Sequence, residues 1–143
     1  MPRVRAGYKG KYKLDKHEFY MAYHYALLYQ EWLAEYNALA DLSTGLRYDI
    51  DTVQTSGGVD TTEANGMRRA ELKGKMEVIE KTVKAVDESL YEWLILGVTC
   101  EGMTFDYLNT VKKMPCCKNV YYSKRRRFYY VLAKRIGIIG DEE

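Results

Sequence analysis

The sequence predicts an all-α fold, in which a long N-terminal antiparallel helix pair is followed by a C-terminal unit of three helices. Apolar residues recur at spacings of three and four, the period of a helix that buries one face. Residues that cap helices stand directly before these periodic segments. No segment alternates apolar and polar residues over the length of a strand. We therefore expect helices joined by turns.

The composition is that of a globular protein. The chain has 143 residues, of which 47% are apolar and 29% are charged, so it can bury a core of its own. No apolar run approaches the roughly 20 residues that cross a bilayer. The first residues also lack the apolar core of a secretory signal. We therefore expect a cytoplasmic protein without a membrane partner, whose three cysteines stay reduced.

The first helix is predicted to begin near Asp15. Asp15 and Glu18 have the spacing of a capping box, which satisfies the first free N–H groups of a helix. No Gly or Pro occurs from Lys16 to about Asp41, so nothing interrupts the helix there. Apolar residues fall on two of its sides, which predicts that both are covered, by the chain itself or by a second copy.

Residues 42–60 are expected to form a long loop. Ser, Thr and Asp residues there are interspersed with three glycines, which break the helical pattern: Gly45, Gly57 and Gly58. A second capping box, Asp60 with Glu63, opens the next helix. Its apolar residues alternate spacings of four and three, as in an antiparallel helix pair or a short coiled coil: Leu72, Met76, Ile79, Val83 and Val86. Residues 14–86 are therefore predicted to be a helical hairpin that serves for oligomerisation.

Residues 87–140 are predicted to contain the three C-terminal helices. Asp87 caps the first of them, and Gly102 is expected to end it. The apolar side of this helix is expected to face the core: Leu90, Trp93, Leu94 and Val98.

A short helix and a longer basic helix complete this unit. Thr104 is a suitable N-cap for a helix over residues 105–113. Pro115 prevents that helix from simply continuing. The last helix is predicted from about Cys117 to Ile136, because Gly137 is a typical C-terminal cap.

The charge is distributed unevenly, although the formal net charge is only +2. Residues 1–13 carry five basic residues and no acid, and they are expected to form a flexible arm. Residues 107–140 carry nine Lys and Arg residues and no acid, and residues 141–143 form an acidic tail. Basic blocks at both ends of the chain predict a polyanionic partner.

The order of a support helix, a short capped helix, a turn and a basic helix is the layout of a helix-turn-helix unit, whose second helix enters the major groove of double-stranded DNA. Part of the basic helix should face the core: Tyr121, Phe128, Val131, Leu132 and Ile136. Five residues are expected to contact base edges: Lys118, Asn119, Tyr122, Ser123 and Arg126. Six others are expected to contact phosphates: Lys112, Lys113, Lys124, Arg125, Arg127 and Lys134.

The C-terminal run is TFDYLNTVKKMPCCKNVYYSKRRRFYYVLAKRIG. It resembles the end of small phage-encoded transcriptional activators of the RinA and ArpU type, most specifically in the tyrosine pair, the basic cluster and the ending FYYVLAKRIG. The resemblance implies a helix-turn-helix similar to the fourth region of bacterial sigma factors. It also implies a phage or prophage origin and a role in switching on late phage genes. RNA polymerase and a second copy of the chain are the protein partners considered for the N-terminal helices.

The turn between the last two helices leaves the register of the basic helix open by one or two residues. Many helix-turn-helix units have a Gly in this turn and a Ser or Thr as the next cap. Here residues 113–117 read KMPCC, and Asn119 is the nearest good cap.

Metal binding and base stacking are less favoured interpretations of the cysteines, histidines and tyrosines. Cys116 and Cys117 lack a CxxC spacing, so a role as small turn residues is preferred to metal binding. His17, His24 and Glu31 recur every seven residues, which is more typical of a solvated stripe than of a metal site. The many tyrosines favour packing over stacking on single strands. No cofactor is expected.

Two other functions stay open beside DNA-binding regulation. One is a phage accessory protein that acts by binding a host protein or polymerase, and the other is a small packaging subunit of the terminase. No phosphate-binding loop, HExxH motif or nucleophile elbow is present, so we do not expect an enzyme. A ring of eight or more copies would favour packaging, and a dimer would favour regulation.

Overall fold

A computed structural model describes the backbone of residues 12–49 and 56–140 and the side chains of residues 12–41 and 62–140. Within these ranges the fold is all-α, as predicted, and contains no strand. The elements are α1 (Lys16–Asp49), α2 (Ser56–Asp87), the 3-10 helix η1 (Glu88–Leu90), α3 (Tyr91–Thr99), α4 (Phe105–Thr110) and α5 (Lys118–Arg135).

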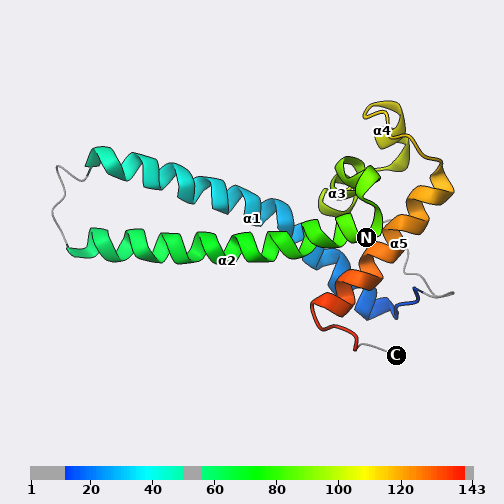
Figure 1. The fold of residues 1–143 in the computed structure, drawn as a ribbon, viewed down its shortest axis with the longest axis horizontal. Helices are drawn as coiled ribbons and strands as arrows, with labels where there is room; N and C mark the ends of the chain where they lie inside the picture. Colours follow the sequence, from blue (N-terminus) through cyan, green and yellow to red (C-terminus); the bar gives the residue numbers. More distant parts are fainter. Residues whose placement is uncertain (1–11, 50–55, 141–143) are drawn as a thin grey trace.

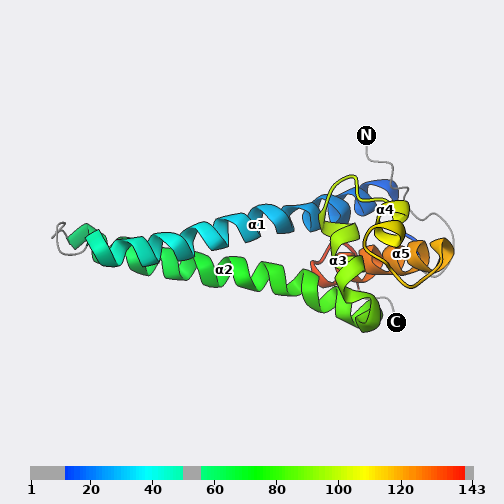
Figure 2. The same ribbon diagram turned by 90° about the horizontal axis from the view of Figure 1, so that it is seen from above.

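Helices α1 and α2 run antiparallel and form a long arm, and the shorter helices gather at one end of it (Figures 1 and 2). The start of α1 is fixed by the predicted acid, because the backbone N–H of Asp15 donates a hydrogen bond to Oε1 of Glu18 at 3.0 Å. The five apolar residues predicted to line the seam of α2 are all buried: Leu72, Met76, Ile79, Val83 and Val86.

Both arm helices are longer than the sequence predicted. The loop expected over residues 42–60 is wrong for residues 42–49, which continue α1, and for residues 56–60, which open α2 ahead of Asp60. Glycine in a helix costs only about 1 kcal/mol, so packing between two helices can outweigh it. Residues 50–55 lie outside the described chain, as do the acidic tail and most of the basic arm.

Polar contacts between α1 and α2 fix the register of the arm. Glu35 accepts two hydrogen bonds from Arg68, from Nε at 2.7 Å and from Nη2 at 3.0 Å. This bidentate geometry holds the pKa of Glu35 below its usual range. Closer to the short helices, the Tyr29 hydroxyl donates to Oε2 of Glu80 at 2.7 Å.

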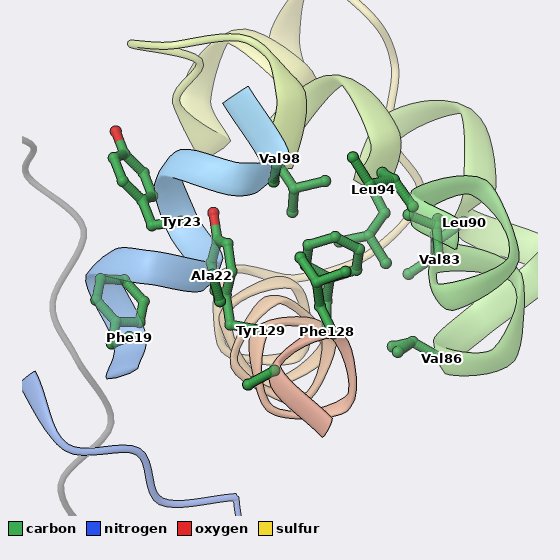
Figure 3. Packing of buried hydrophobic residues seen from close by; sticks show 14 of the residues in the cluster. Phe19, Ala22, Tyr23, Val83, Val86, Leu90, Leu94, Val98, Phe128 and Tyr129 are labelled. Atoms are coloured by element: carbon green, nitrogen blue, oxygen red, sulfur yellow. The ribbon is translucent and has the colours of Figure 1, made fainter. Parts of the chain in front are cut away.

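The core lies where the arm meets α3 and α5. Figure 3 shows Ala22 of α1 and Val83 of α2 facing Val98 of α3, with Phe128 of α5 between these helices. Helix α5 packs against α1, α2 and α3, so the basic helix is held by both parts of the chain. Its orientation therefore depends on the arm as well as on the C-terminal unit.

Candidate nucleic-acid interface

The short helix α4 begins where the sequence predicted. Thr104 is its N-cap, and the Thr104 hydroxyl accepts a hydrogen bond from the backbone N–H of Tyr107 at 3.1 Å. The helix ends at Thr110, three residues before the predicted end at residue 113. The preceding helix also differs, because Asp87 caps η1, and α3 ends at Thr99 ahead of Gly102.

The turn between α4 and α5 is fixed by contacts that the sequence did not indicate. Met114 is 2% exposed, and its backbone N–H donates to the carbonyl of Leu108 at 3.0 Å. The Asn109 side-chain amide donates to the Met114 carbonyl at 3.0 Å, and the Trp93 indole donates to the Lys112 carbonyl at 2.7 Å. Lys113 has φ of 60°, the left-handed conformation that glycine adopts more readily. These contacts set the path of the chain into α5.

Helix α5 begins at Lys118, and its N-cap is Cys117. Cys117 makes no side-chain capping hydrogen bond. The sequence suggested Asn119 as the cap. Asn119 instead lies in the first turn of the helix. The helix thus starts on Lys118, five residues after Lys113 in the sequence.

Four of the five predicted base-contacting residues are exposed on α5: Lys118, Asn119, Ser123 and Arg126. Tyr122 is only half-exposed. Its ring lies beneath the guanidinium of Arg125, 4.6 Å from the ring centre, and packs edge-on against Tyr121 at 5.2 Å. Tyr122 is therefore tied to the helix surface more closely than the other four.

The six predicted phosphate-contacting residues differ in their exposure and in their ion pairs. Lys112 and Lys113 are exposed in the turn, and Arg127 and Lys134 are half-exposed on α5. Among the described residues, these four have no carboxylate within 4.0 Å. Lys124 instead forms an ion pair with Asp87 at 3.4 Å.

Arg125 is 9% exposed, which is a correction to its predicted place on the phosphate-contacting face. It stands four residues after Tyr121 and four before Tyr129, and both tyrosines are buried. Positions four apart lie on the same side of a helix. Arg125 consequently belongs to the inner face of α5.

The inner face of α5 is rotated relative to the prediction. Tyr121, Phe128 and Leu132 are buried as expected, and Ile136 is partly buried against the core. Val131 is only half-buried, and the core takes Tyr129 and Ala133 in its place. Each tyrosine pair of α5 therefore has one buried ring and one half-buried ring, while Ser123 and Arg126 remain exposed.

Asp87 ties the end of the arm to α5. Its carboxylate accepts hydrogen bonds from the Ser89 hydroxyl at 2.6 Å and the Ser89 backbone N–H at 3.0 Å, in addition to the Lys124 ion pair. The Ser89 hydroxyl, with help from the Lys124 charge, lowers the pKa of Asp87. A carboxyl whose pKa is lowered by folding stabilises the protein above its unfolded pKa, and that contribution is lost as the pH falls through the folded value.

Replacing Asp87 by asparagine is expected to lower the free energy of unfolding by about 1 kcal/mol at neutral pH, since it weakens a cap and removes an ion pair. The difference from the wild type should shrink in acid, below the ordinary Asp pKa of about 4. Urea unfolding at neutral and acidic pH measures both effects, with the exposed Asp41→Asn as the control. A difference that stays constant with pH would show that the charge of Asp87 plays no part.

Comparisons with known proteins do not identify this surface. The chain matches no protein-family model, and no curated protein or solved structure is significantly similar to it. Among the helices of the described residues, none combines the length and the apolar character needed to cross a membrane. In the same residues, no group of three or more His, Cys, Asp or Glu side chains is arranged to hold a metal ion. The function of the surface is therefore inferred from its chemistry.

Proposed function

We propose that this protein is a sequence-specific DNA-binding regulator of transcription, in which α5 docks in the major groove of double-stranded DNA. The observation that carries the proposal is the basic surface of α5 and the preceding turn. Its cations have no carboxylate partner within the described residues. Six residues form this surface: Lys112, Lys113, Lys118, Arg126, Arg127 and Lys134.

The exposed N-terminal half of α5 carries the side chains suited to read bases. Arg126 has the geometry to recognise guanine through two hydrogen bonds, and Asn119 can recognise adenine in the same way. Ser123 lies between them and can bond to several bases. Lys118 completes the group at the start of the helix, where helix-turn-helix proteins make their base contacts.

Phosphate contacts are assigned to four cations in this proposal. They are Lys112, Lys113, Arg127 and Lys134, because Lys124 is paired with Asp87 and Arg125 is buried. Contacts to phosphates orient a protein on DNA without reading sequence. If all four are engaged, log affinity should fall against log salt with a slope of about −3.6.

The arm is proposed to join two copies of the chain or to contact RNA polymerase. It extends well beyond the helices that carry the basic surface (Figure 1). Met21, Leu28 and Met67 are exposed on the arm helices, where apolar side chains favour contact with another protein. Phage origin and activation of late genes are part of the proposal and rest on the resemblance of residues 104–137 alone.

The same exposed arm favours a second candidate, a phage accessory protein that acts by binding a host protein. A complex with a host protein that forms without DNA and resists salt would support that candidate. The third candidate, a packaging subunit, predicts a ring of eight or more copies. The mass of the purified protein in solution separates a ring from a dimer.

Two substitutions test the assigned roles on α5 and the turn. Arg126→Ala should reduce the preference for the cognate site by about tenfold or more, because a bidentate base contact contributes about 1–3 kcal/mol of discrimination. Lys112→Gln with Lys113→Gln should weaken binding to all sequences and make the salt slope shallower by about 2. Titration of cognate and scrambled duplexes at several salt concentrations measures both quantities.

Lys73→Gln is the matched control, because Lys73 is an exposed lysine of the arm. It should leave affinity and salt slope unchanged. Equal, sequence-independent losses from the Arg126 variant and the double lysine variant would refute the division between base and phosphate contacts.

A further inference from the structure

A cleft of about 920 Å³ opens between α1, the α3–α4 connection and α5. This volume lies within the range of pockets that bind small molecules. Several of its walls are aromatic: Phe19, Tyr23, Phe105, Tyr122 and Tyr129. Phe19 and Tyr129 meet edge-on with ring centres 5.1 Å apart, and Figure 3 shows them together with Tyr23 at one edge of the core. Phe105 and Tyr122 are half-exposed, so these two rings are the ones that a ligand can contact.

The cleft also contains the buried cation Arg125. Its guanidinium carbon lies 4.6 Å from the centre of the Tyr122 ring and 5.4 Å from that of Tyr121, which holds the group in place. No carboxylate of the described residues lies within 4.0 Å of Arg125. An anion that enters the cleft can therefore pair with this guanidinium.

A second buried polar group lines the same cleft. The Tyr129 side chain is 1% exposed, and within the described residues its hydroxyl has no hydrogen-bond partner. Buried polar groups of native proteins are nearly always paired, so an unpaired hydroxyl requires an explanation. Burial raises the pKa of Tyr129, while the nearby charge of Arg125 lowers it. The hydroxyl thus stays protonated and remains a hydrogen-bond donor beside the cation.

We propose that this cleft binds a small aromatic carboxylate. Its anionic group would accept hydrogen bonds from Arg125 and from the Tyr129 hydroxyl, and its ring would pack on Phe105 and Tyr122. Lys118 and Arg126 line the same cleft, so three cations favour an anionic ligand, and the aromatic walls favour one with a flat apolar body. Glu101 and Asp106 also line the cleft and disfavour a ligand with several negative charges. The proposal does not rest on the proposed function, although Lys118 and Arg126 belong to both sites.

Calorimetric titration of the full chain with 2-naphthoate and benzoate tests this site. At least one of the two should bind with a stoichiometry of one. Its uncharged carboxamide should bind about tenfold more weakly or worse, since the charged hydrogen bonds are lost. Inorganic phosphate alone should not bind at millimolar concentration. Backbone amide signals of Gly97 and Gly102, which line the cleft, should shift on binding.

Three variants assign the binding to the cleft. Arg125→Met should weaken carboxylate binding by about tenfold or more, and Tyr129→Phe should weaken it by about fivefold. Arg127→Met, on the same helix but outside the cleft, should leave the affinity within twofold. If Arg125→Met does not fold, the result rests on Tyr129→Phe, which removes only a hydroxyl that has no partner within the described residues.

Three results would overturn the proposal. They are the absence of binding by both carboxylates at millimolar concentration, equal binding of a carboxylate and its carboxamide, and carboxylate binding that Tyr129→Phe leaves unchanged.

Discussion

Gly97→Ala is expected to lower the free energy of unfolding by about 2 kcal/mol or more, because it overpacks the contact between α3 and α5. A Cβ atom at residue 97 would stand 2.0 Å from the Tyr121 hydroxyl oxygen and 3.1 Å from the ring carbon that bears it. Tyr121 is fully buried, so its rigid ring has no free space into which it can move. Urea unfolding of the variant measures the loss.

A second substitution should restore much of this stability. Tyr121→Phe removes the oxygen that the new methyl group would strike, and it leaves only the contacts with two ring carbons, at 3.1 and 3.4 Å. The double variant Gly97→Ala/Tyr121→Phe should therefore be more stable than Gly97→Ala alone, by about 1 kcal/mol or more. Gly74→Ala is the matched control, because a Cβ there meets nothing within 4 Å. It should stabilise α2 by up to about 1 kcal/mol. Additive effects of the two substitutions at residues 97 and 121 would show that the contact does not limit packing.

Met114→Ala is expected to cost about 2 to 5 kcal/mol, the range for removing a fully buried methionine side chain. The buried Met114 side chain anchors the turn between α4 and α5. Without it, residues 111–117 lose this contact with the core. The same variant should bind DNA more weakly at a temperature where it is still folded, because Lys112 and Lys113 are carried by that turn. Urea unfolding and DNA titration measure the two effects.

The methionine controls separate anchoring from a general loss of apolar surface. Met67→Ala removes a side chain that is 70% exposed and should change stability by less than about 0.5 kcal/mol. Met114→Leu keeps the volume and should cost less than about 1.5 kcal/mol. Unchanged stability of Met114→Ala would contradict the role of this residue as an anchor.

The sequence predicted those features that depend on a single local pattern. The seam of α2 follows from five apolar residues at spacings of three and four, and all five are buried. The start of α4 follows from Thr104, whose hydroxyl can accept a hydrogen bond at a helix N-terminus. In both cases the residues that determine the element are close together in the sequence, so no tertiary contact was needed to find it.

Features that depend on tertiary packing were harder to predict. Adjacent tyrosines occur twice in α5, at residues 121–122 and 129–130. Either member of each pair could face the core, so the sequence alone does not determine which side of the helix is buried. Packing of Tyr129 against Phe19 settles that choice and draws Arg125 inward. The extent of the arm depends likewise on the pairing of two helices, which outweighs the glycines that locally favoured a loop.

The proposed function requires that the exposed residues of α5 recognise a DNA sequence. It is tested most directly by incubating the protein with fragmented phage DNA at two salt concentrations and sequencing the fragments that it retains. We expect enrichment of one promoter-proximal site that survives the higher salt and that Arg126→Ala no longer enriches. Uniform retention of all fragments that disappears at the higher salt would contradict it, because a basic surface alone binds DNA in that way.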